Sequence, residues 1–455
     1  MAAHFSLVRK TRALAPALML AMVGTLPFAA HSARAQASAS TPQVTLIGTV
    51  VAHDARLTAL AWSPDGKLLA SLGEDRCIKL WDERGKQTPT RIELGFSASA
   101  IYWSSDSQQI AAVGGKTALT FRIDGTEVAR LSGHVGDITS FSWSTDSRSI
   151  LTSSEDRTSK LWEATTGKTI FSITPSGSQR KQTRSLVKAL FTRSVLFDSE
   201  STQASFADDQ TIVTASMTSF SNKFPRLWDA ATGEKIAKLQ ANESDTKPNF
   251  VSISPDRQTI VTSGFAEARM WDTGTGKLMA TLPEIAGRVR FSPDGKKILA
   301  NGCLKLTRVG CEPQAAIWDV ATRQRIVTLD APTDEFIGLG WSADGSKVVT
   351  SVRHEHASIW NADNGNLITT VPLVKDRGWV TDYVDNLMLS RSGQILFAVT
   401  DKYVKFWNAT TGDLLLEHES SKKGAPLPFA AHPLGHVVAA ADGKTGTLWF
   451  WSIVE

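Results

Sequence analysis

Apolar and polar residues alternate in short runs along most of the chain, and turns rich in Ser, Pro, Asp and Gly separate these runs. In one example, the alternating run Leu57–Trp62 is followed by the turn 63–66 and then by a second apolar run that begins at Leu68. Alternation with a period of two on both sides of a tight turn is typical of paired antiparallel strands. Six clear copies of this turn and three weaker ones occur, beginning at Ser63, Ser104, Ser144, Ala207, Ser254, Ser292, Ser342, Ser390 and His432.

A second signal follows each turn. It is an aromatic residue, usually a tryptophan with a polar neighbour, and its nine copies are Trp81, Phe121, Trp162, Trp228, Trp271, Trp318, Trp360, Trp407 and Trp451. Seven of the eight spacings between them fall between 40 and 47 residues, and the eighth is 66. Most copies precede a Gly-containing turn and one more strand. A repeat of this length with four strands predicts the blades of a β-propeller, and we count nine.

These turns and aromatics resemble the WD-repeat family over nearly all of residues 44–455. In that family a His, a Ser or Thr, an Asp and the Trp hold a blade together. Two complete sets stand here at equal spacing, namely His53, Ser71, Asp75 and Trp81, and His134, Thr152, Asp156 and Trp162. The resemblance implies an all-β fold, a single closed propeller of four-stranded antiparallel blades, in which these eight side chains are structural. Our count is nine blades, with seven or eight as alternatives.

The last repeat lacks one strand. The chain ends at Glu455, four residues after Trp451, which is too early for an outer strand. A strand pattern without a partner is present at 44–50, before the first repeat. Pairing of the two ends would close the ring and remove sheet edges that invite aggregation. We therefore expect one propeller over 44–455.

The first 35 residues have the pattern of a cleavable signal peptide. A basic segment that starts at Arg9 precedes the apolar run 14–30, and the small-x-small sequence at 33–35 fits a cleavage site. Residues 36–43 then form a short linker. An uncleaved anchor is one alternative, although the run is just under the ~20 residues a spanning helix needs. A mitochondrial transit peptide is another, although the compact apolar run fits it poorly. The sequence thus predicts an exported, bacterial-type protein, periplasmic or secreted, with no stable membrane insertion after cleavage.

Composition and charge fit a soluble binding protein without a nucleic-acid partner. Hydrophobic residues make up 42% of the chain and charged residues 21%. Without the leader the chain has 45 basic and 45 acidic residues, so it carries no net charge that would attract nucleic acid. Cys303 and Cys311 bracket a short insertion, and export favours a disulfide between them, with a free pair as the alternative.

The common catalytic and metal-binding motifs are incomplete. The sequence has no HExxH or GxSxG motif, and the Gly-Lys-Thr fragments at 115–117 and 443–445 lack the upstream glycine of a phosphate-binding loop. His354 and His356, and likewise His432 and His436, have no evident third ligand for a metal. We therefore expect no enzyme activity, no metal and no cofactor.

The distribution of insertions points to an interaction surface. In the strand order of the family, first-to-second and third-to-fourth connections share one face of the disc, and the other connections share the opposite face. The four longest segments, 175–205, 217–225, 301–314 and 372–386, belong to that opposite face. Its candidate partner-binding residues are Arg180, Lys181, Arg184, Lys188, Arg377 and Trp379. The sequence predicts a monomeric, non-catalytic scaffold for a protein or peptide partner; the alternative is an enzyme or small-ligand binder that uses the central channel.

Overall fold

The computed structural model describes most of the chain after residue 40. The described residues are 41–173, 202–216, 224–240, 248, 250–264, 267–283, 285, 287–307, 310–329, 336–352, 356–373, 386–400, 403–420, 427–442 and 444–455. They form nine four-stranded antiparallel sheets and no helix. Within these ranges, accordingly, no helix has the length and apolar character that a membrane span needs. The predicted nine-bladed, all-β fold is confirmed.

The first three blades follow the chain from the innermost strand outward. Blade one comprises β2 (Leu57–Trp62), β3 (Leu69–Gly73), β4 (Cys77–Trp81) and β5 (Gln87–Glu93). Blade two comprises β6 (Ala100–Trp103), β7 (Gln109–Gly114), β8 (Thr117–Arg122) and β9 (Glu127–Ser132). Blade three comprises β10 (Ile138–Trp143), β11 (Ser149–Ser154), β12 (Ser159–Glu163) and β13 (Thr169–Ile173).

The next three blades keep the same order. Blade four comprises β14 (Thr202–Phe206), β15 (Thr211–Ser216), β16 (Arg226–Asp229) and β17 (Lys235–Lys238). Blade five comprises β18 (Phe250–Ile253), β19 (Thr259–Ser263), β20 (Glu267–Asp272) and β21 (Leu278–Pro283). Blade six comprises β22 (Val289–Phe291), β23 (Lys297–Thr307), β24 (Gly310–Asp319) and β25 (Arg325–Leu329).

The last three blades complete the ring, and the ninth borrows a strand. Blade seven comprises β26 (Phe336–Trp341), β27 (Lys347–Val352), β28 (His356–Asn361) and β29 (Leu367–Pro372). Blade eight comprises β30 (Asn386–Leu389), β31 (Ile395–Val399), β32 (Tyr403–Asn408) and β33 (Leu414–Glu419). Blade nine combines β34 (Phe429–Ala431), β35 (Val437–Ala441) and β36 (Thr447–Val454) with β1 (Gln43–Val51) from the other end of the chain.

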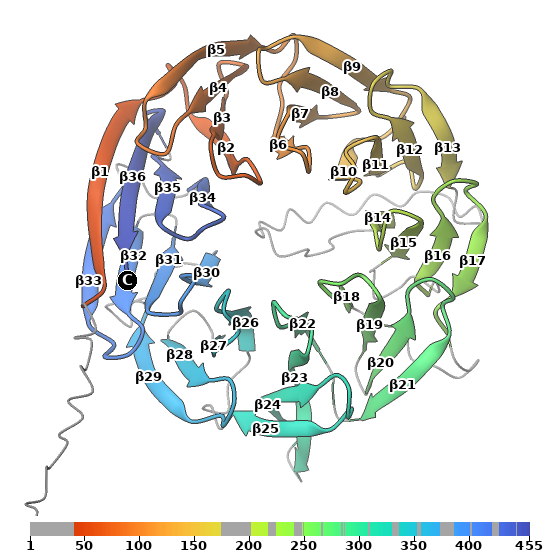
Figure 1. The fold of residues 1–455 in the computed structure, drawn as a ribbon, viewed down its shortest axis with the longest axis vertical. Helices are drawn as coiled ribbons and strands as arrows, with labels where there is room; N and C mark the ends of the chain where they lie inside the picture. The colour runs from red at the N-terminus through yellow and green to blue at the C-terminus, as the bar shows by residue number, and fades with distance from the viewer. Residues whose placement is uncertain are drawn as a thin grey trace, which may run out of the picture. The chain divides into compact units, whose positions relative to one another are not determined.

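The hydrophobic core lies between neighbouring blades. Figure 1 shows the nine sheets side by side in a ring, with the first strand of each blade nearest the centre. Among the described residues the core divides into nine clusters, and each draws its side chains from two successive blades. Trp162 and Trp451 are fully buried in this way. The recurring aromatics therefore join one blade to the next, which explains their repeat.

The two ends of the chain close the ring. β1 pairs with β36 from Gln43 opposite Val454 to Val51 opposite Thr447, with a register shift between Leu46 and Gly48. Next to this pair, the amide of Ala52 donates to the carbonyl of Gly446 at 2.9 Å. Blade nine thus has its fourth strand, and its packing against blade one joins the last repeat to the first.

Ser-x-Asp turns organise one side of the disc. In the turn 63–68, Ser63 Oγ donates to Asp65 Oδ1 at 2.7 Å and accepts from the amide of Leu68. Neighbouring turns are also bonded, because the amide of Asp65 donates to Ser107 Oγ in the next blade at 3.1 Å. The same serine–aspartate bond forms in the turns at 104, 144, 254, 292 and 342. We call the side that carries these turns the turn face.

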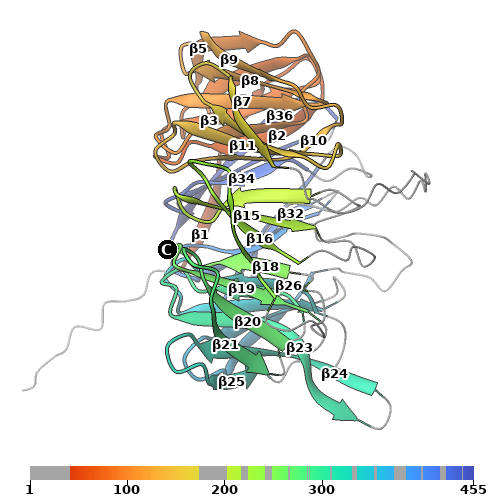
Figure 2. The same cartoon turned by 90° about the vertical axis from the view of Figure 1, so that its right-hand side faces the viewer.

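The insertion at 301–314 differs from the loop that the sequence suggested. β23 and β24 pair from Lys297 opposite Asp319 to Thr307 opposite Gly310, with a register shift between Cys303 and Lys305, and Figure 2 shows them projecting beyond the neighbouring strands. The extra residues lengthen an existing ladder, because pairing satisfies backbone groups that a loop would leave to water. The side chains of Cys303 and Cys311 lie outside the described part of the structure, and the disulfide stays a prediction.

Candidate functional site

The predicted set in blade one forms a hydrogen-bonded chain from the turn to the blade core. His53 Nδ1 lies 2.9 Å from the Asp75 carboxylate, and His53 Nε2 lies 2.8 Å from Ser71 Oγ. Trp81 Nε1 donates to the same Ser71 oxygen at 2.8 Å. A carboxylate only accepts, so the imidazole proton sits on Nδ1 and the serine hydroxyl donates to Nε2.

This order of Ser, His and Asp is also the order of a nucleophilic triad, but the environment is wrong for catalysis. Ser71 is fully buried and His53 is 1% exposed. The serine oxygen already accepts the indole proton of Trp81, and a substrate carbonyl has no path to it. The set therefore ties β3 and β4 to the segment before β2, as the resemblance implied.

Blade three repeats the arrangement. His134 bonds to Asp156 at 2.9 Å and to Thr152 Oγ1 at 2.8 Å, and Trp162 Nε1 donates to Thr152 Oγ1 at 2.8 Å. Burial lowers the pKa of His134, although the hydrogen bond from its ring to Asp156 acts in the opposite direction. Burial acts to raise the pKa of Asp156, but hydrogen bonds from Thr158, the amide of Val135 and His134 outweigh it and hold that pKa well below its ordinary value.

The indole–hydroxyl bond extends to blades without the full set. Trp228, Trp271 and Trp360 donate to Thr214, Thr262 and Thr350. In blades six, eight and nine the equivalent position, two residues after the strand partner of the tryptophan, holds Ala300, Ala398 and Ala440. Among the described residues, the indole nitrogens of Trp318 and Trp451 are buried without a hydrogen-bond partner. In blades six and nine, the alanine at this position offers no acceptor to the buried indole N–H.

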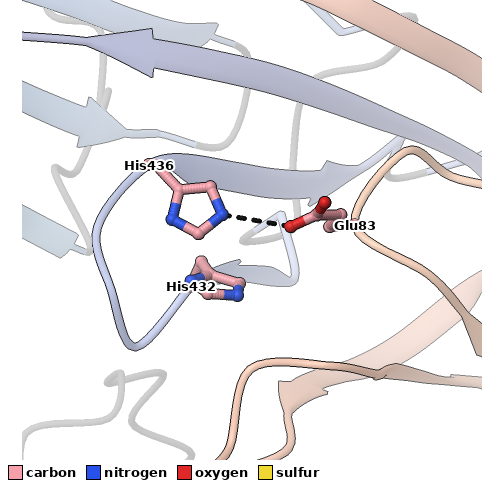
Figure 3. A group of neighbouring side chains, drawn as sticks. All are labelled: Glu83, His432 and His436. Carbon is pink, nitrogen blue, oxygen red and sulfur yellow. Dashed lines mark hydrogen bonds and ion pairs between the residues drawn. The ribbon is translucent and has the colours of Figure 1, made fainter.

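A cluster of two histidines and a glutamate lies at the seam between blades nine and one. Figure 3 shows His432 and His436, from the β34–β35 turn, beside Glu83 from the β4–β5 turn. His436 Nε2 donates to Glu83 Oε2 at 3.2 Å, and the two imidazole ring centres are 4.0 Å apart. The cluster borders an open hollow of about 450 Å³ on the turn face. The other side chains around it are Asp65, Lys67, Asp82, Arg84 and Leu434, and Gly66 completes the lining.

His432 is the fixed member of this cluster. Its Nε2 donates to the carbonyl of Gly66 at 2.8 Å, and its Nδ1 accepts from the amide of Leu434 at 3.0 Å. Gly66 has a φ of 76°, and a Cβ there would come within 2.4 Å of His432 Nε2, so the turn needs glycine to admit the ring. Burial lowers the pKa of His432. Its hydrogen bond to Gly66 therefore links blade nine to blade one.

The sequence singled out both histidines but missed Glu83. The glutamate is 353 residues from His436 in the chain, and only closure of the ring brings the two turns together. The sequence held one signal that could have pointed to Glu83, namely the expected pairing of the two ends of the chain. That pairing makes the turns of blade one neighbours of the turns of blade nine.

The predicted partner-binding residues fall in parts of the chain that the structure does not describe. They are Arg180, Lys181, Arg184, Lys188, Arg377 and Trp379, and all six lie outside the described residues. Their assignment to an interaction surface therefore stays a prediction.

Comparison with known proteins agrees with the repeats and the blade geometry. The family description "WD domain, G-beta repeat" matches residues 44–82 and 125–163. Each matched stretch contains one complete set, His53 to Trp81 or His134 to Trp162. The chain has the fold of a WD40 propeller, and these two stretches are WD40 repeats. Each stretch covers the outer strand of one blade and the first three strands of the next, so a WD40 repeat here bridges two blades.

Several WD40 relatives align with this chain at low identity. Autophagy-related protein 16 of Arabidopsis thaliana is 22% identical over 340 residues, which are 70% of this chain and 58% of the relative. Protein tipD of Dictyostelium discoideum is 32% identical over 126 residues, or 26% of this chain and 20% of its own length. The guanine nucleotide-binding protein subunit beta of Zea mays is 23% identical over 342 residues, covering 69% of this chain and 82% of the subunit.

A solved structure supports the fold. The C-terminal WD40 domain of Sif2 has a TM-score of 0.53 and 13% sequence identity, covering 91% of this chain and 99% of that domain. At this identity the likeness concerns the WD40 fold alone. The alignment covers less than two-thirds of Autophagy-related protein 16 and of tipD, and all the relatives named here are eukaryotic. The exported, bacterial-type origin therefore stays a prediction from the leader.

Proposed function

We propose that this chain is a non-catalytic interaction scaffold that binds a protein or peptide partner through the face opposite the turn face. We call that side the connection face; it carries the second-to-third connections within blades and the links between blades. The observation that carries the proposal is the contrast between the two faces. On the turn face, short turns bond within themselves and to their neighbours, as the bond from Asp65 to Ser107 illustrates.

The connections on the connection face contain more residues than the turns on the turn face. In an antiparallel sheet, connections alternate between the two ends of the strands, so β13 ends and β14 begins at this side, and so do the pairs β15 and β16, and β29 and β30. The β23–β24 hairpin has strands of 11 and 10 residues, whereas β3 and β4 have five each. Loops held on a rigid scaffold are common sites of binding. The name of one relative, a guanine nucleotide-binding protein subunit, places that relative in an assembly, which supports a scaffold role for this propeller.

The test compares two variants of the chain that starts at residue 36. This starting point follows from the proposal that the leader is removed on export. One variant changes the connection face by Arg377→Ala, Trp379→Ala and a shortened segment 176–193. Its matched control changes the turn face by Lys67→Ala and Arg148→Ala, whose side chains are 80% and 85% exposed. Each protein is used for affinity capture from envelope and secreted fractions, with circular dichroism to verify folding.

The proposal expects a partner that the unchanged chain and the turn-face control recover equally. It expects the connection-face variant to recover that partner at least tenfold less while keeping its β-sheet spectrum. If recovery of the partner depends on the turn-face residues instead, the partner binds the turn face and the proposal is wrong. Equal recovery of background proteins by all three chains would contradict a scaffold function.

A further inference from the structure

We propose that Glu83, His432 and His436 bind a divalent first-row transition metal, for which Zn²⁺ is the probe, and that the ion joins blade nine to blade one. This site is independent of the proposed partner surface, since it lies on the turn face. Two ligands come from the β34–β35 turn and the third from the β4–β5 turn, as Figure 3 shows. Their ligand atoms all lie within 4.8 Å of one another.

The spacing of the best-placed pair suits a tetrahedral ion. Zinc bonds of 2.0–2.1 Å at a tetrahedral angle hold two ligand atoms about 3.3 Å apart. His436 Nε2 and Glu83 Oε2 are 3.2 Å apart, so an ion can replace the proton they share without moving either backbone. The two side chains are 42% and 50% exposed, so they can rotate to shorten the widest separation to His432.

The donor types select the class of metal. Two imidazoles and one carboxylate match zinc and its first-row neighbours, whereas Mg²⁺ and Ca²⁺ prefer all-oxygen shells. Three protein ligands leave a fourth position for water, and the open hollow of about 450 Å³ gives water access to it. The nearby ammonium of Lys67 is paired with Asp65 at 3.0 Å, which reduces its repulsion of a cation.

His432 anchors the site through its backbone contacts. A neutral imidazole has one N–H, so coordination through Nδ1 replaces the hydrogen bond from the Leu434 amide and leaves Nε2–H donating to the carbonyl of Gly66. The remaining bond then orients the ring, as outer-shell partners of metal-bound histidines do. Trp62 packs edge-on against the same ring, with centroids 4.8 Å apart, and limits its rotation.

Metal binding here has a consequence for folding. The ligands are far apart in the unfolded chain, so the ion binds the closed ring in preference to the unfolded state and stabilises it. A site that uses both ends of the propeller therefore strengthens closure at the seam, where β1 and blade nine meet blade one.

The test is a Zn²⁺ titration of the full-length chain after treatment with a chelator. Isothermal calorimetry gives the stoichiometry and dissociation constant, and thermal unfolding gives the shift in Tm. The variants are Glu83→Gln and His436→Asn, because both side chains are half-exposed and neither change should disturb folding. The matched control is Glu93→Gln, which removes a carboxylate from another exposed ion pair in blade one.

We expect one Zn²⁺ per chain at this site, a Tm rise of about 2–4 °C at saturation and no response to Mg²⁺. Each variant should weaken this binding at least tenfold and abolish the Tm rise, whereas Glu93→Gln should behave like the unchanged chain. Equal Zn²⁺ affinities for the unchanged chain and both variants would show that any zinc binds elsewhere and would overturn the proposal. Absence of Zn²⁺ binding in the unchanged chain would overturn it as well.

Discussion

At the scale of single residues, the buried polar groups decide how well each blade is held. His53 and His134 each link an Asp to a hydroxyl and, through it, to a Trp indole. Such a network contributes stability only while every member has its partner, because an unpaired buried group loses its hydration without compensation. The nine blades share a backbone plan, but they differ in how completely this network is present.

The buried histidines predict loss of stability in mild acid. Burial lowers the pKa of both His53 and His134 below 6.5, although the neighbouring Asp acts to raise each. The unfolded chain therefore takes up more protons than the folded chain below about pH 6.5, so the free energy of unfolding falls as pH decreases through that value. Urea unfolding at pH 7.5 and 5.5 should show this fall, and His134→Gln should reduce it. An equal fall in that variant would contradict the assignment to His134.

The unpaired indole of Trp318 predicts a stabilising substitution. Ala300→Ser places a hydroxyl where other blades have one, and we expect it to raise the free energy of unfolding by about 1 kcal/mol. Ala112→Ser is the matched control, since Ala112 holds the same position next to Phe121, which has no N–H to donate. Urea unfolding of both variants measures the difference. A gain of the same size in the control would remove the hydrogen bond as its cause.

At the scale of strands and turns, local features could be predicted from the sequence and distant ones could not. The Ser-x-Asp turns and the tryptophans are fixed by bonds to nearby residues, such as Ser63 to Asp65 and Trp162 to Thr152, so their spacing alone predicted strands and blades. The hairpin at 301–314 was expected as an insertion, because its alternation is weak and its ladder is defined only by β23 pairing with β24. Glu83 could not be placed beside His436 without the register of the closed ring.

The junction of β1 with blade nine predicts a sensitive glycine. Gly446 has a φ of 67°, and a Cβ there would come within 2.1 Å of the carbonyl oxygen of His53. Gly446→Ala should therefore lower the free energy of unfolding by about 3 kcal/mol, through backbone strain and separation of the two segments. Gly95→Ala is the control, because its Cβ would meet nothing within 4 Å. Thermal unfolding should separate the two; equal small effects would argue against close packing at the junction.

At the scale of the whole molecule, the ring depends on both ends of the chain. β1 covers the edge of β36 and packs beside blade eight through Val44. Without it, the ring has an exposed strand edge that can pair with another chain. The rigid disc that results from closure is also what would hold the connection-face loops in fixed positions for a partner.

Removal of β1 should open the ring. A chain that lacks residues 41–51 should unfold at lower temperature and with less cooperativity, and it should form larger species on size-exclusion chromatography because the edge of β36 is exposed. A chain that starts at residue 41 is the control and should remain a cooperative monomer. A truncated chain with unchanged size and melting would show that closure by β1 contributes little.

Hydrogen–deuterium exchange on the complex with a captured partner tests the scaffold function most directly, because it maps the contact on every blade at once. The account predicts that the partner slows exchange in the long segments of the connection face, including the outer part of the β23–β24 hairpin, and leaves the turn 63–68 and its copies unchanged. Protection confined to the turn face, or to the innermost strands around the ring centre, would contradict it.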